Sequence, residues 1–549
     1  MLKSALQIAR SSYIPKMPSV LNGSVKPVEG EATSSVSDQE EIQKLFPNTF
    51  GKPIITFEAS DETIGAGEPL NVGVILSGGQ APGGHNVIAG IFDGIKRLHS
   101  DSALYGFILG PAGLINHKYK ELTADIIDEY RNTGGFDIIG SGRDKLETKE
   151  QFDKGLEILK ELNIKALVII GGDDSNTNAS ILAEYYSSIN AGVQVVGCPK
   201  TIDGDLKNEQ IETSFGFDTA CKVYSEVIGN IQRDCNSARK YWHFIKLMGR
   251  SASHIALECA LQTQPNMCII SEEVAHKEQS LDDIVTEIAS VVAKRSEMGN
   301  DFGTVLIPEG LIEFIPAMKN LISELNDFLA HNQEEFDLVR RSAKREYIIS
   351  KLSKENSDIY ASLPETVARQ LTLDRDPHGN VQVSLIETEK LLAEMVASKL
   401  KEWTNEGKYN GKFSTITHFF GYEGRCAAPS NYDADYCYSL GYTASMLISA
   451  GKTGYLSSVR NTTAPASEWI SGGIPITMMM NMERRHGVMK PVIQKALVEL
   501  EGKPFKYFAA NRDKWAFETS FVYPGPIQYF GPTEVCDQPS ITLSLEQSK

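Results

Sequence analysis

The sequence lacks several features that mark well-known classes of protein. None of its eight cysteines form a CxxC pair or an evident pairing framework, a pattern typical of a reducing compartment with mostly buried thiols and unfavourable for a zinc site. Nowhere do 18 apolar residues follow one another, so we expect no membrane span. The pattern GxxxxGK[ST] is also missing, which excludes a P-loop nucleotide site.

Positive charge is scarce. The chain has 54 Lys and Arg against 71 Asp and Glu, a formal net charge of -17, which argues against nucleic acid as the main partner. An anionic small substrate remains compatible with this balance, because a basic pocket can lie in an acidic protein. With 549 residues, 41% of them hydrophobic, the chain is long enough for two or three globular domains.

The N-terminal residues weakly resemble a transit peptide. Lys3, Arg10 and Lys16 are accompanied by serines, and no acidic residue precedes Glu29. Because the apolar periodicity there is short, an ordinary N-terminal helix is the favoured interpretation.

The most informative stretch runs from Ala166 to Asp205. Two apolar runs, 166–170 and 193–196, each break into a turn rich in glycine and aspartate, at 171–175 and 199–205. About 20 residues of helix-compatible sequence separate the runs, so the stretch is typical of a βαβ unit. In such units ligands bind outside the carboxyl ends of the strands, and both turns are therefore expected to face one crevice.

Further strands are expected at 71–76, 105–109 and 136–139, which with the βαβ unit predict a doubly wound, mainly parallel α/β domain. The first run leads into Gly78 and Gly79 before a helical pattern, a turn suited to binding phosphate through backbone N–H groups. The third leads into Arg143, at another strand end.

A second set of runs, at 241–247, 267–270 and 304–307, predicts a second α/β domain facing the first across an active-site cleft. Residues 311–411 are charged and helical in pattern and receive no chemistry. The α/β pattern resumes at 413–418, and helices are expected at 433–450 and 492–500. The predicted parts are an arm (1–65), a domain with the phosphate-binding turn (66–214 and 426–549), a second α/β domain (215–310 and 412–425) and a helical insertion (311–411).

Carboxylates and cations gather at the predicted strand ends. They are Asp173, Asp174, Asp203 and Asp205, with Arg143, Lys200 and Arg250. A single Asp in a turn is more often a helix cap or an Asx-turn, but four acids on adjacent turns repel one another and need a compensating cation. With glycine turns, this set is typical of Mg²⁺-dependent phosphoryl transfer, in which an Asp accepts a hydroxyl proton.

Taken in order, these motifs resemble those of the phosphofructokinases, and within that family the long, pyrophosphate-dependent group, over nearly the whole chain. The resemblance implies reversible transfer of phosphoryl from pyrophosphate to the 1-hydroxyl of fructose 6-phosphate, in a cytoplasmic homodimer with shared sites and no membrane or nucleic-acid partner. The motifs are Gly78-Gly79, Gly171-Gly172-Asp173-Asp174-Ser175, Pro199-Lys200-Thr201-Ile202-Asp203-Gly204-Asp205, Met248-Gly249-Arg250, Pro308-Glu309-Gly310 and Tyr422-Glu423-Gly424-Arg425.

The resemblance also implies a role for each residue. Gly79 would contact pyrophosphate, Asp173 would bind Mg²⁺, and Asp203 would be the catalytic base, assisted by Lys200, Asp174, Arg143 and Arg250 and flanked by Thr201, Ile202 and Asp205. Fructose 6-phosphate would be held by Met248, Gly249, Arg250, Glu309, Tyr422 and Arg425. Lys240 and Tyr241 match a stretch that reaches the site of a second subunit.

Two residues bear on the phosphoryl donor. ATP-using members of the family have glycine at the position of Asp174, whose carboxylate would fill the space of the nucleotide α-phosphate and repel its charge. They have a smaller residue at Lys200, whose ammonium would follow the charge on the transferred group. Three alternatives remain: a non-catalytic regulatory subunit, an ATP-dependent sugar-phosphate kinase, and a different small-molecule kinase. The carboxylates present at 173, 203 and 205 count against the first, and the motifs at 248, 309 and 422 against the last.

Overall fold

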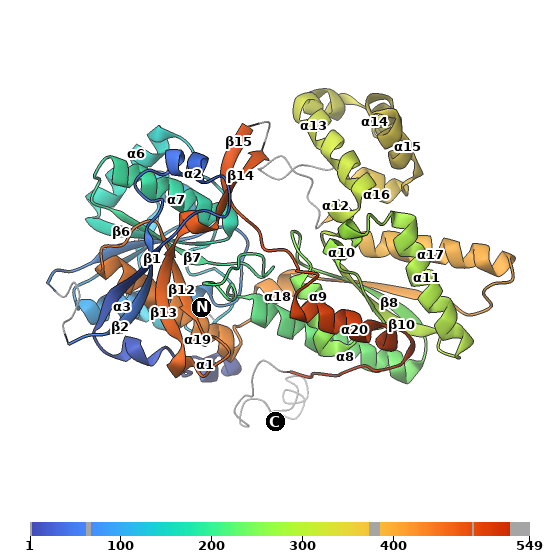
Figure 1. Cartoon of the computed structure of the whole chain (residues 1–549), viewed down its shortest axis with the longest axis horizontal. Helices are drawn as coiled ribbons and strands as arrows, with labels where there is room; N and C mark the ends of the chain where they lie inside the picture. The colour runs from blue at the N-terminus through green and yellow to red at the C-terminus, as the bar shows by residue number, and fades with distance from the viewer. Residues whose placement is uncertain (1–2, 62–66, 373–384, 486–487, 527–549) are drawn as a thin grey trace, which may run out of the picture. The chain divides into compact units, whose positions relative to one another are not determined.

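The chain folds into two compact units, seen in a computed structural model that describes residues 3–61, 67–372, 385–485 and 488–526 (Figure 1). Unit 1 contains the described residues up to Ala220 together with Glu423–Ala496. Unit 2 contains Cys221–Tyr422 and the described residues from Leu497 onward. Residues 497–526, grouped above with the domain that has the phosphate-binding turn, thus belong to unit 2, and which ligand each unit binds stays a prediction.

Unit 1 is built on a nine-stranded sheet in the order β1-β2-β13-β12-β7-β6-β3-β4-β5. The strands from β12 to β4 run parallel, whereas β1, β2, β13 and β5 pair antiparallel. The predicted parallel core is therefore confirmed, and antiparallel strands, including those of the N-terminal arm, extend it at both edges. Its strands are β1 Val25–Ala32, β2 Pro53–Ala59, β3 Asn71–Leu76, β4 Leu104–Phe107, β5 Tyr119–Glu121, β6 Ile164–Gly171, β7 Gln194–Pro199, β12 Tyr455–Arg460 and β13 Ile470–Pro475.

The three central strands are apolar over nearly their whole length because helices cover both faces of the sheet. Leu167 and Ile169 of β6 are buried in one cluster with residues of α6 and α7. Their neighbours along the strand point to the opposite face, where α19 packs on α3 and on the sheet (Figure 1). Helices of unit 1 are α1 Ala5–Arg10, α2 Gln39–Leu45, α3 Gly84–Leu98, α4 Pro111–Ile115, α5 Ala124–Tyr130, α6 Lys149–Glu161, α7 Asp173–Ser188 and α19 Asn431–Ser449.

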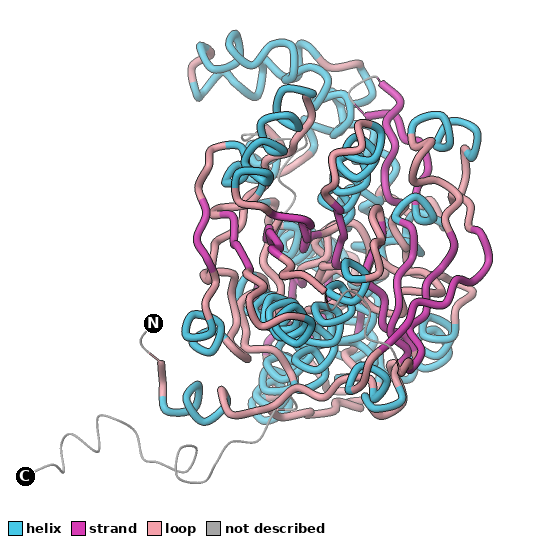
Figure 2. Tube along the Cα trace, turned by 90° about the vertical axis from the view of Figure 1, so that its left-hand side faces the viewer, coloured by secondary structure: helices cyan, strands magenta, loops and turns pink. Residues whose placement is uncertain are grey.

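Unit 2 contains a four-stranded sheet that is parallel throughout, in the order β11-β8-β10-β9. Its strands are β8 Tyr241–Leu247, β9 Met267–Cys268, β10 Phe302–Pro308 and β11 Thr415–Phe420. In the described part of residues 311–405, unit 2 contains six α-helices. Figure 2 draws all the described helices of the chain in cyan. Helices of unit 2 are α9 His254–Thr263, α10 Ser271–His276, α11 Leu281–Glu297, α12 Leu311–Phe314, α13 Pro316–Leu338, α14 Lys344–Lys351, α15 Lys354–Ser362, α16 Glu365–Gln370, α17 Thr388–Asn405 and α20 Lys503–Phe517.

Two helices, α8 (Phe217–Ala238) and α18 (Tyr422–Arg425), begin in one unit and end in the other. A hairpin of β14 (Met480–Arg485) and β15 (Val488–Ile493) belongs to unit 1, and β15 packs on α7. Among the described residues, no helix is both long and apolar enough to cross a membrane. Five of the seven described cysteines are buried and none forms a disulfide; Cys536 lies outside the described residues.

Two expected elements are wrong. Phe136, Ile138 and Ile139 are buried and Asp137 is exposed, but the run forms a turn, in which the Gly140 N–H donates to the Phe136 carbonyl at 2.7 Å. Burial of so short an apolar run does not distinguish a strand from a turn. The helix expected at 492–500 is absent as well: β15 runs to Ile493 and an extended segment follows.

Candidate active site

The backbone of the turn after β3 is uncovered at two successive glycines, Gly78 and Gly79. Gly78 has a φ of 84°, and its N–H donates to the Gly142 carbonyl at 2.9 Å. A Cβ on Gly78 would lie 3.2 Å from Lys200 Nζ. One on Gly79 would lie 3.2 Å from Arg425 Nη1 and 3.9 Å from an Arg143 Nη atom. Three cations therefore converge on a bare backbone turn, an arrangement suited to phosphate oxygens.

The turn after β6 places two carboxylates at the start of a helix. Asp173 and Asp174 are the first residues of α7, where the helix dipole favours negative charge. In the same first turn of the helix, the hydroxyl of Ser175 donates to the Ser77 hydroxyl at 2.8 Å. This bond joins the β6 turn to the β3 turn, so the two predicted motifs share one edge of the sheet.

Three of the four carboxylates lie beside a cation from a distant part of the chain. Nζ of Lys495 lies 3.6 Å from Oδ2 of Asp173, and Nζ of Lys145 donates to Oδ1 of Asp174 at 3.1 Å. An Arg425 Nη atom lies 3.7 Å from Oδ1 of Asp203. The mutual repulsion expected from the sequence is thus offset by ion pairs.

The turn after β7 carries the most deeply buried charges. Lys200 continues the strand pairing through its N–H, which donates to the Gly171 carbonyl at 2.9 Å, and its side chain is buried. Burial, reinforced by the charge of Arg425, lowers the pKa of Lys200 to about 8, although Asp203 and Asp173 act in the opposite direction.

Asp205 is buried beside the same turn. Burial raises its pKa to about 7, and the charges of Asp203 and Asp173 contribute to the rise, while Lys495 opposes it. Close to neutral pH, one acid and one base of this turn are therefore near their midpoints.

Asp203 is held by its own turn. Its N–H donates to the Thr201 hydroxyl at 3.0 Å, and the Thr201 carbonyl accepts from the Ser214 hydroxyl at 3.1 Å. Within the described residues, Asp203 Oδ1 is buried and accepts no hydrogen bond. The side chain of Ile202 is fully buried, so a ligand could meet this residue through its backbone alone. The carboxylate of Asp203 thus has lone pairs available for a hydroxyl proton or a metal ion.

In unit 2, the ends of β8 and β10 meet at neighbouring positions. The Gly249 N–H donates to the Glu309 carboxylate at 3.2 Å, and the Glu309 N–H donates to the Leu247 carbonyl at 2.9 Å. A Cβ on Gly310 would lie 1.8 Å from the Arg250 carbonyl oxygen, so any side chain there would displace the backbone. The Met248 N–H bonds to the end of β11.

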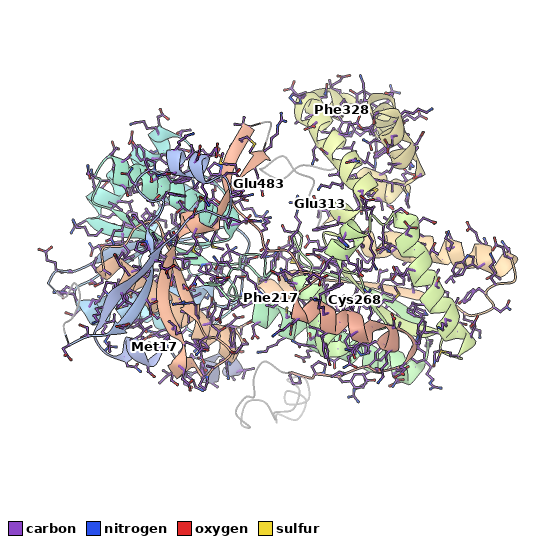
Figure 3. All side chains as sticks on the ribbon, in the orientation of Figure 1. Met17, Phe217, Cys268, Glu313, Phe328 and Glu483 are labelled. Atoms are coloured by element: carbon purple, nitrogen blue, oxygen red, sulfur yellow. The ribbon has the colours of Figure 1, made fainter. Side chains whose placement is uncertain are left out.

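Arg250 is held by a residue that the sequence analysis did not single out. Its Nε and one Nη donate to the two carboxylate oxygens of Glu313 at 3.3 and 3.2 Å, a bidentate pair. Glu313 belongs to α12 and is labelled in Figure 3. Tyr422, after β11, is 65% exposed.

Lys240 and Tyr241 are not brought to this edge of unit 2. Tyr241 begins β8 and Met248 follows its last residue, so the two lie at opposite ends of a seven-residue strand, roughly 20 Å apart by strand geometry. Their predicted contact with a second subunit's site stays a prediction.

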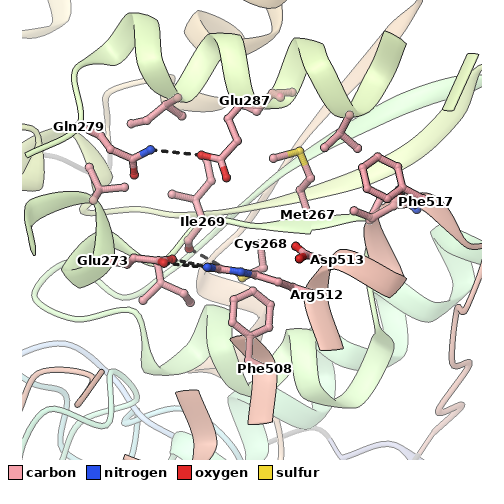
Figure 4. A pocket seen from close by; sticks show the side chains of 17 residues that line it. Met267, Cys268, Ile269, Glu273, Gln279, Glu287, Phe508, Arg512, Asp513 and Phe517 are labelled. Atoms are coloured by element: carbon pink, nitrogen blue, oxygen red, sulfur yellow. Dashed lines mark hydrogen bonds and ion pairs between the residues drawn. The ribbon is translucent and has the colours of Figure 1, made fainter. Parts of the chain in front are cut away.

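Unit 2 also contains a cavity of about 110 Å³, shown in Figure 4. It lies among β9, α10, α11 and α20, and on one wall Arg512 forms a bidentate pair with Glu273 at 2.6 and 2.9 Å. The predicted site residues do not line it, so the cavity is separate from the predicted site.

Three charged residues of these sites are not among the predicted site residues. The sequence places the charge of Lys145 in a loop expected to bring cations to a strand end, but it does not show that Lys145 meets Asp174. Glu313 and Lys495 gave no signal, because each lies in a stretch that was expected to be helical. A helical sequence pattern does not show which charged side chain will pair with a turn far away in the sequence.

Comparison with known proteins identifies the family. A sequence model described as Phosphofructokinase matches residues 71–448. The pyrophosphate–fructose 6-phosphate 1-phosphotransferase of Porphyromonas gingivalis is 69% identical over 548 residues, covering 100% of both chains. The protein of that name from Treponema pallidum is 55% identical over 556 residues, covering 99% of this chain and 97% of the relative.

A solved structure agrees with the fold. The pyrophosphate-dependent phosphofructokinase of Nitrosospira multiformis superposes with a TM-score of 0.54, covering 82% of this chain and 93% of that one. At 14% sequence identity, this likeness bears on the fold alone.

Proposed function

The chain belongs to the phosphofructokinase family, and on that premise we propose that it transfers a phosphoryl group reversibly from pyrophosphate to the 1-hydroxyl of fructose 6-phosphate. The products are fructose 1,6-bisphosphate and phosphate, a step of glycolysis and gluconeogenesis. The observation that carries the proposal is the group of carboxylates and cations at the ends of β3, β6 and β7, supported by relatives that bear this enzyme's name.

On the donor side, pyrophosphate binds at the glycine turn. The bare backbone at Gly79 leaves room for phosphate oxygens, and Lys200 and Arg143 neutralise them as the bond to the leaving phosphate breaks. Asp174, held by Lys145, fills and charges the space that a nucleotide α-phosphate would need. The donor is thus selected by repulsion as well as by attraction.

On the acceptor side, Asp203 is the base. Its carboxylate takes the proton of the 1-hydroxyl, the hydroxyl oxygen forms a bond to the terminal phosphorus, and the electrons of the broken P–O bond pass to the leaving phosphate. The hydrogen bond to Thr201 fixes the turn that presents this carboxylate, and Arg425 stands beside it.

Oxygen donors at the site fit a magnesium ion. Mg²⁺ prefers carboxylate and phosphate oxygens and is commonly held by one or two protein carboxylates plus substrate. Asp173 would hold it, and the buried Asp203 Oδ1, which accepts no hydrogen bond within the described residues, marks a place where further positive charge is accommodated. When bound, the ion would neutralise charge on the phosphates. No group of three or more potential ligand residues occurs in the described part of the chain, and a substrate-bridged Mg²⁺ does not need one.

Fructose 6-phosphate is bound by the strand ends of unit 2. Arg250 supplies positive charge for the 6-phosphate, and Glu309 and the backbone of Met248 and Gly249 supply hydrogen bonds for the sugar. Tyr422 is a further residue proposed to bind fructose 6-phosphate. In a cytoplasmic homodimer, Lys240 and Tyr241 would serve the site of the second subunit, consistent with their distance from Met248.

Incubation of the purified protein with fructose 6-phosphate, MgCl₂ and either pyrophosphate or ATP tests the proposal. Phosphorus NMR should show fructose 1,6-bisphosphate and phosphate with pyrophosphate, and the reverse reaction should proceed from these products. Asp203→Asn is the matched control and should be nearly inactive. Turnover with ATP alone would make the protein an ATP-dependent kinase, and no turnover with either donor would favour a regulatory subunit.

A further inference from the structure

Lys495 has a fixed place in unit 1 although it lies in an extended segment. The N–H groups of its two neighbours are both bonded: Gln494 donates to the Met479 carbonyl at 2.8 Å, and Ala496 donates to the Asp205 carbonyl at 2.7 Å. Just before them, the Ile493 N–H donates to the Thr177 hydroxyl of α7 at 3.2 Å. The segment is therefore tied both to α7 and to the turn that carries Asp205.

The ammonium of Lys495 faces the acidic group as a whole. It lies 3.6 Å from Oδ2 of Asp173, and its side chain is 37% exposed. Burial lowers the pKa of this ammonium, but the charges of Asp173, Asp205, Asp174 and Asp203 outweigh burial, so the net shift of the pKa is upward. Nζ of Lys145 lies 3.1 Å from Asp174, and an Arg425 Nη atom lies 3.7 Å from Asp203.

This contact matters because Asp173 is the residue proposed to bind the divalent cation. A cation on that carboxylate would lie within a few ångströms of the ammonium, and two positive charges at such a distance repel each other. Pyrophosphate reverses the sign of the interaction, since a metal–pyrophosphate complex carries net negative charge. The ammonium then attracts the complex through its phosphate oxygens.

We propose that Lys495 couples metal binding to donor binding: it weakens the binding of a divalent cation alone and strengthens the binding of the cation together with pyrophosphate. The inference rests on the proposed function, since it takes Asp173 as the metal ligand and pyrophosphate as the donor. It assigns a pyrophosphate-binding role to a residue in the segment that follows the β14–β15 hairpin, outside the glycine turns.

Lys495→Met tests the coupling, because methionine keeps an apolar stem and removes the charge. The probe for the metal is Mn²⁺ without pyrophosphate, measured by the electron paramagnetic resonance signal of the free ion. We expect Mn²⁺ to bind the variant about tenfold more tightly than the wild type. The probe for the donor is imidodiphosphate with Mg²⁺, measured by calorimetry, and its affinity should fall about tenfold.

Lys490→Met is the matched control. Lys490 lies in β15, just before the segment that carries Lys495, but its ammonium lies 3.8 Å from Glu147, outside the acidic group. Both affinities should equal those of the wild type. Lys495→Arg keeps the charge and should restore weak Mn²⁺ binding and tight imidodiphosphate binding. Should Lys495→Met unfold, Lys495→Gln carries the same expectations.

Opposite changes in the two affinities support the coupling, because loss of a merely structural contact would not tighten metal binding. Unchanged or weaker Mn²⁺ binding in a folded Lys495→Met or Lys495→Gln protein overturns it. Wild-type Mn²⁺ affinity that survives Asp173→Asn also overturns it. Failure of the proposed function is recognised separately: the wild type would then make no fructose 1,6-bisphosphate, whether or not Mn²⁺ binding responds to Lys495.

Discussion

The strand ends of the two units use different physical means to form a polar site. In unit 1, ion pairs hold the site together: Asp173, Asp174 and Asp203 each lie beside a cation from elsewhere in the chain. In unit 2, backbone contacts determine most of the site: the Gly249 N–H donates to Glu309, and Gly310 leaves space for the Arg250 carbonyl.

Because of this difference, we expect the two sites to tolerate different substitutions. The unit 1 site balances repelling carboxylates against cations, so removal of one charge alters the affinity and protonation of its neighbours. The unit 2 site is determined by close backbone approach, so added bulk should harm it more than altered charge. Substitutions at the two sites test this contrast.

Removal of Asp203, the proposed catalytic base, should have the largest effect. Asp203→Ala leaves no group to accept the proton of the 1-hydroxyl, so kcat should fall by roughly two to four decades. Affinity for fructose 6-phosphate, measured by calorimetry, should change little. A variant with near-normal kcat would show that another group is the base.

Added bulk should damage the unit 2 site. Gly310→Ala places a Cβ 1.8 Å from the Arg250 carbonyl oxygen, so the backbone must move. We expect a loss of about 1–3 kcal/mol in the free energy of unfolding and at least a tenfold rise in KM for fructose 6-phosphate. Glu313→Gln, which removes charge and keeps the volume, is the control and should raise that KM less. The contrast between the units fails if the order is reversed.

A buried acid should make stability depend on pH. Asp205 has a pKa of about 7 in the folded protein against an ordinary value of 3.8. Between these values the unfolded chain releases the proton and the folded chain retains it, so the free energy of unfolding falls as pH rises. Asp205→Asn removes this penalty. It should be more stable than the wild type by about 1–4 kcal/mol above pH 7, with the gain vanishing near pH 4.

Chemical denaturation at several pH values measures this difference. A gain that is constant from pH 4 to pH 8 would mean that the carboxylate of Asp205 titrates normally.

Loss of one buried positive charge should give the smallest effect at neutral pH. Because the pKa of Lys200 is lowered to about 8, its ammonium is charged below that pH and neutral above it. The kcat/KM for pyrophosphate should therefore fall above pH 8, by up to about tenfold per pH unit. Lys200→Arg should have a lower but flatter profile up to pH 10, since guanidinium stays charged. Parallel profiles would show that Lys200 does not control this limb.

The sequence predicted the parallel core of both sheets because buried strands that end in glycine or polar turns leave a clear pattern. The runs at 71–76 and 241–247 match β3 and β8 residue for residue. The antiparallel strands added by the arm could not be predicted, because β1 and β2 are partly exposed and their pattern is weak. Their pairing depends on contacts remote in sequence.

At the site, the acids could be predicted from the sequence, but the cations that pair with them could not. Asp173, Asp174 and Asp203 lie in turns that directly follow strands, so topology alone brings them to one edge. Lys495 reaches Asp173 from the end of a hairpin, and the sequence predicted a helix there. The loop with Arg143 arrives at the β3 turn through an isolated pairing of Gly142 with Ser77, although the strand expected before it is a turn.

Selection of the donor by Asp174 is tested most sharply by comparing the wild type with Asp174→Gly. The measured quantity is the ratio of kcat/KM for pyrophosphate to kcat/KM for ATP. If Asp174, held by Lys145, selects the donor by charge and volume, the ratio should be large in the wild type. It should then fall by about a hundredfold or more in the variant, as pyrophosphate use weakens and ATP use appears. A wild type that prefers ATP, or a ratio unchanged by the substitution, would show that Asp174 does not select pyrophosphate over ATP.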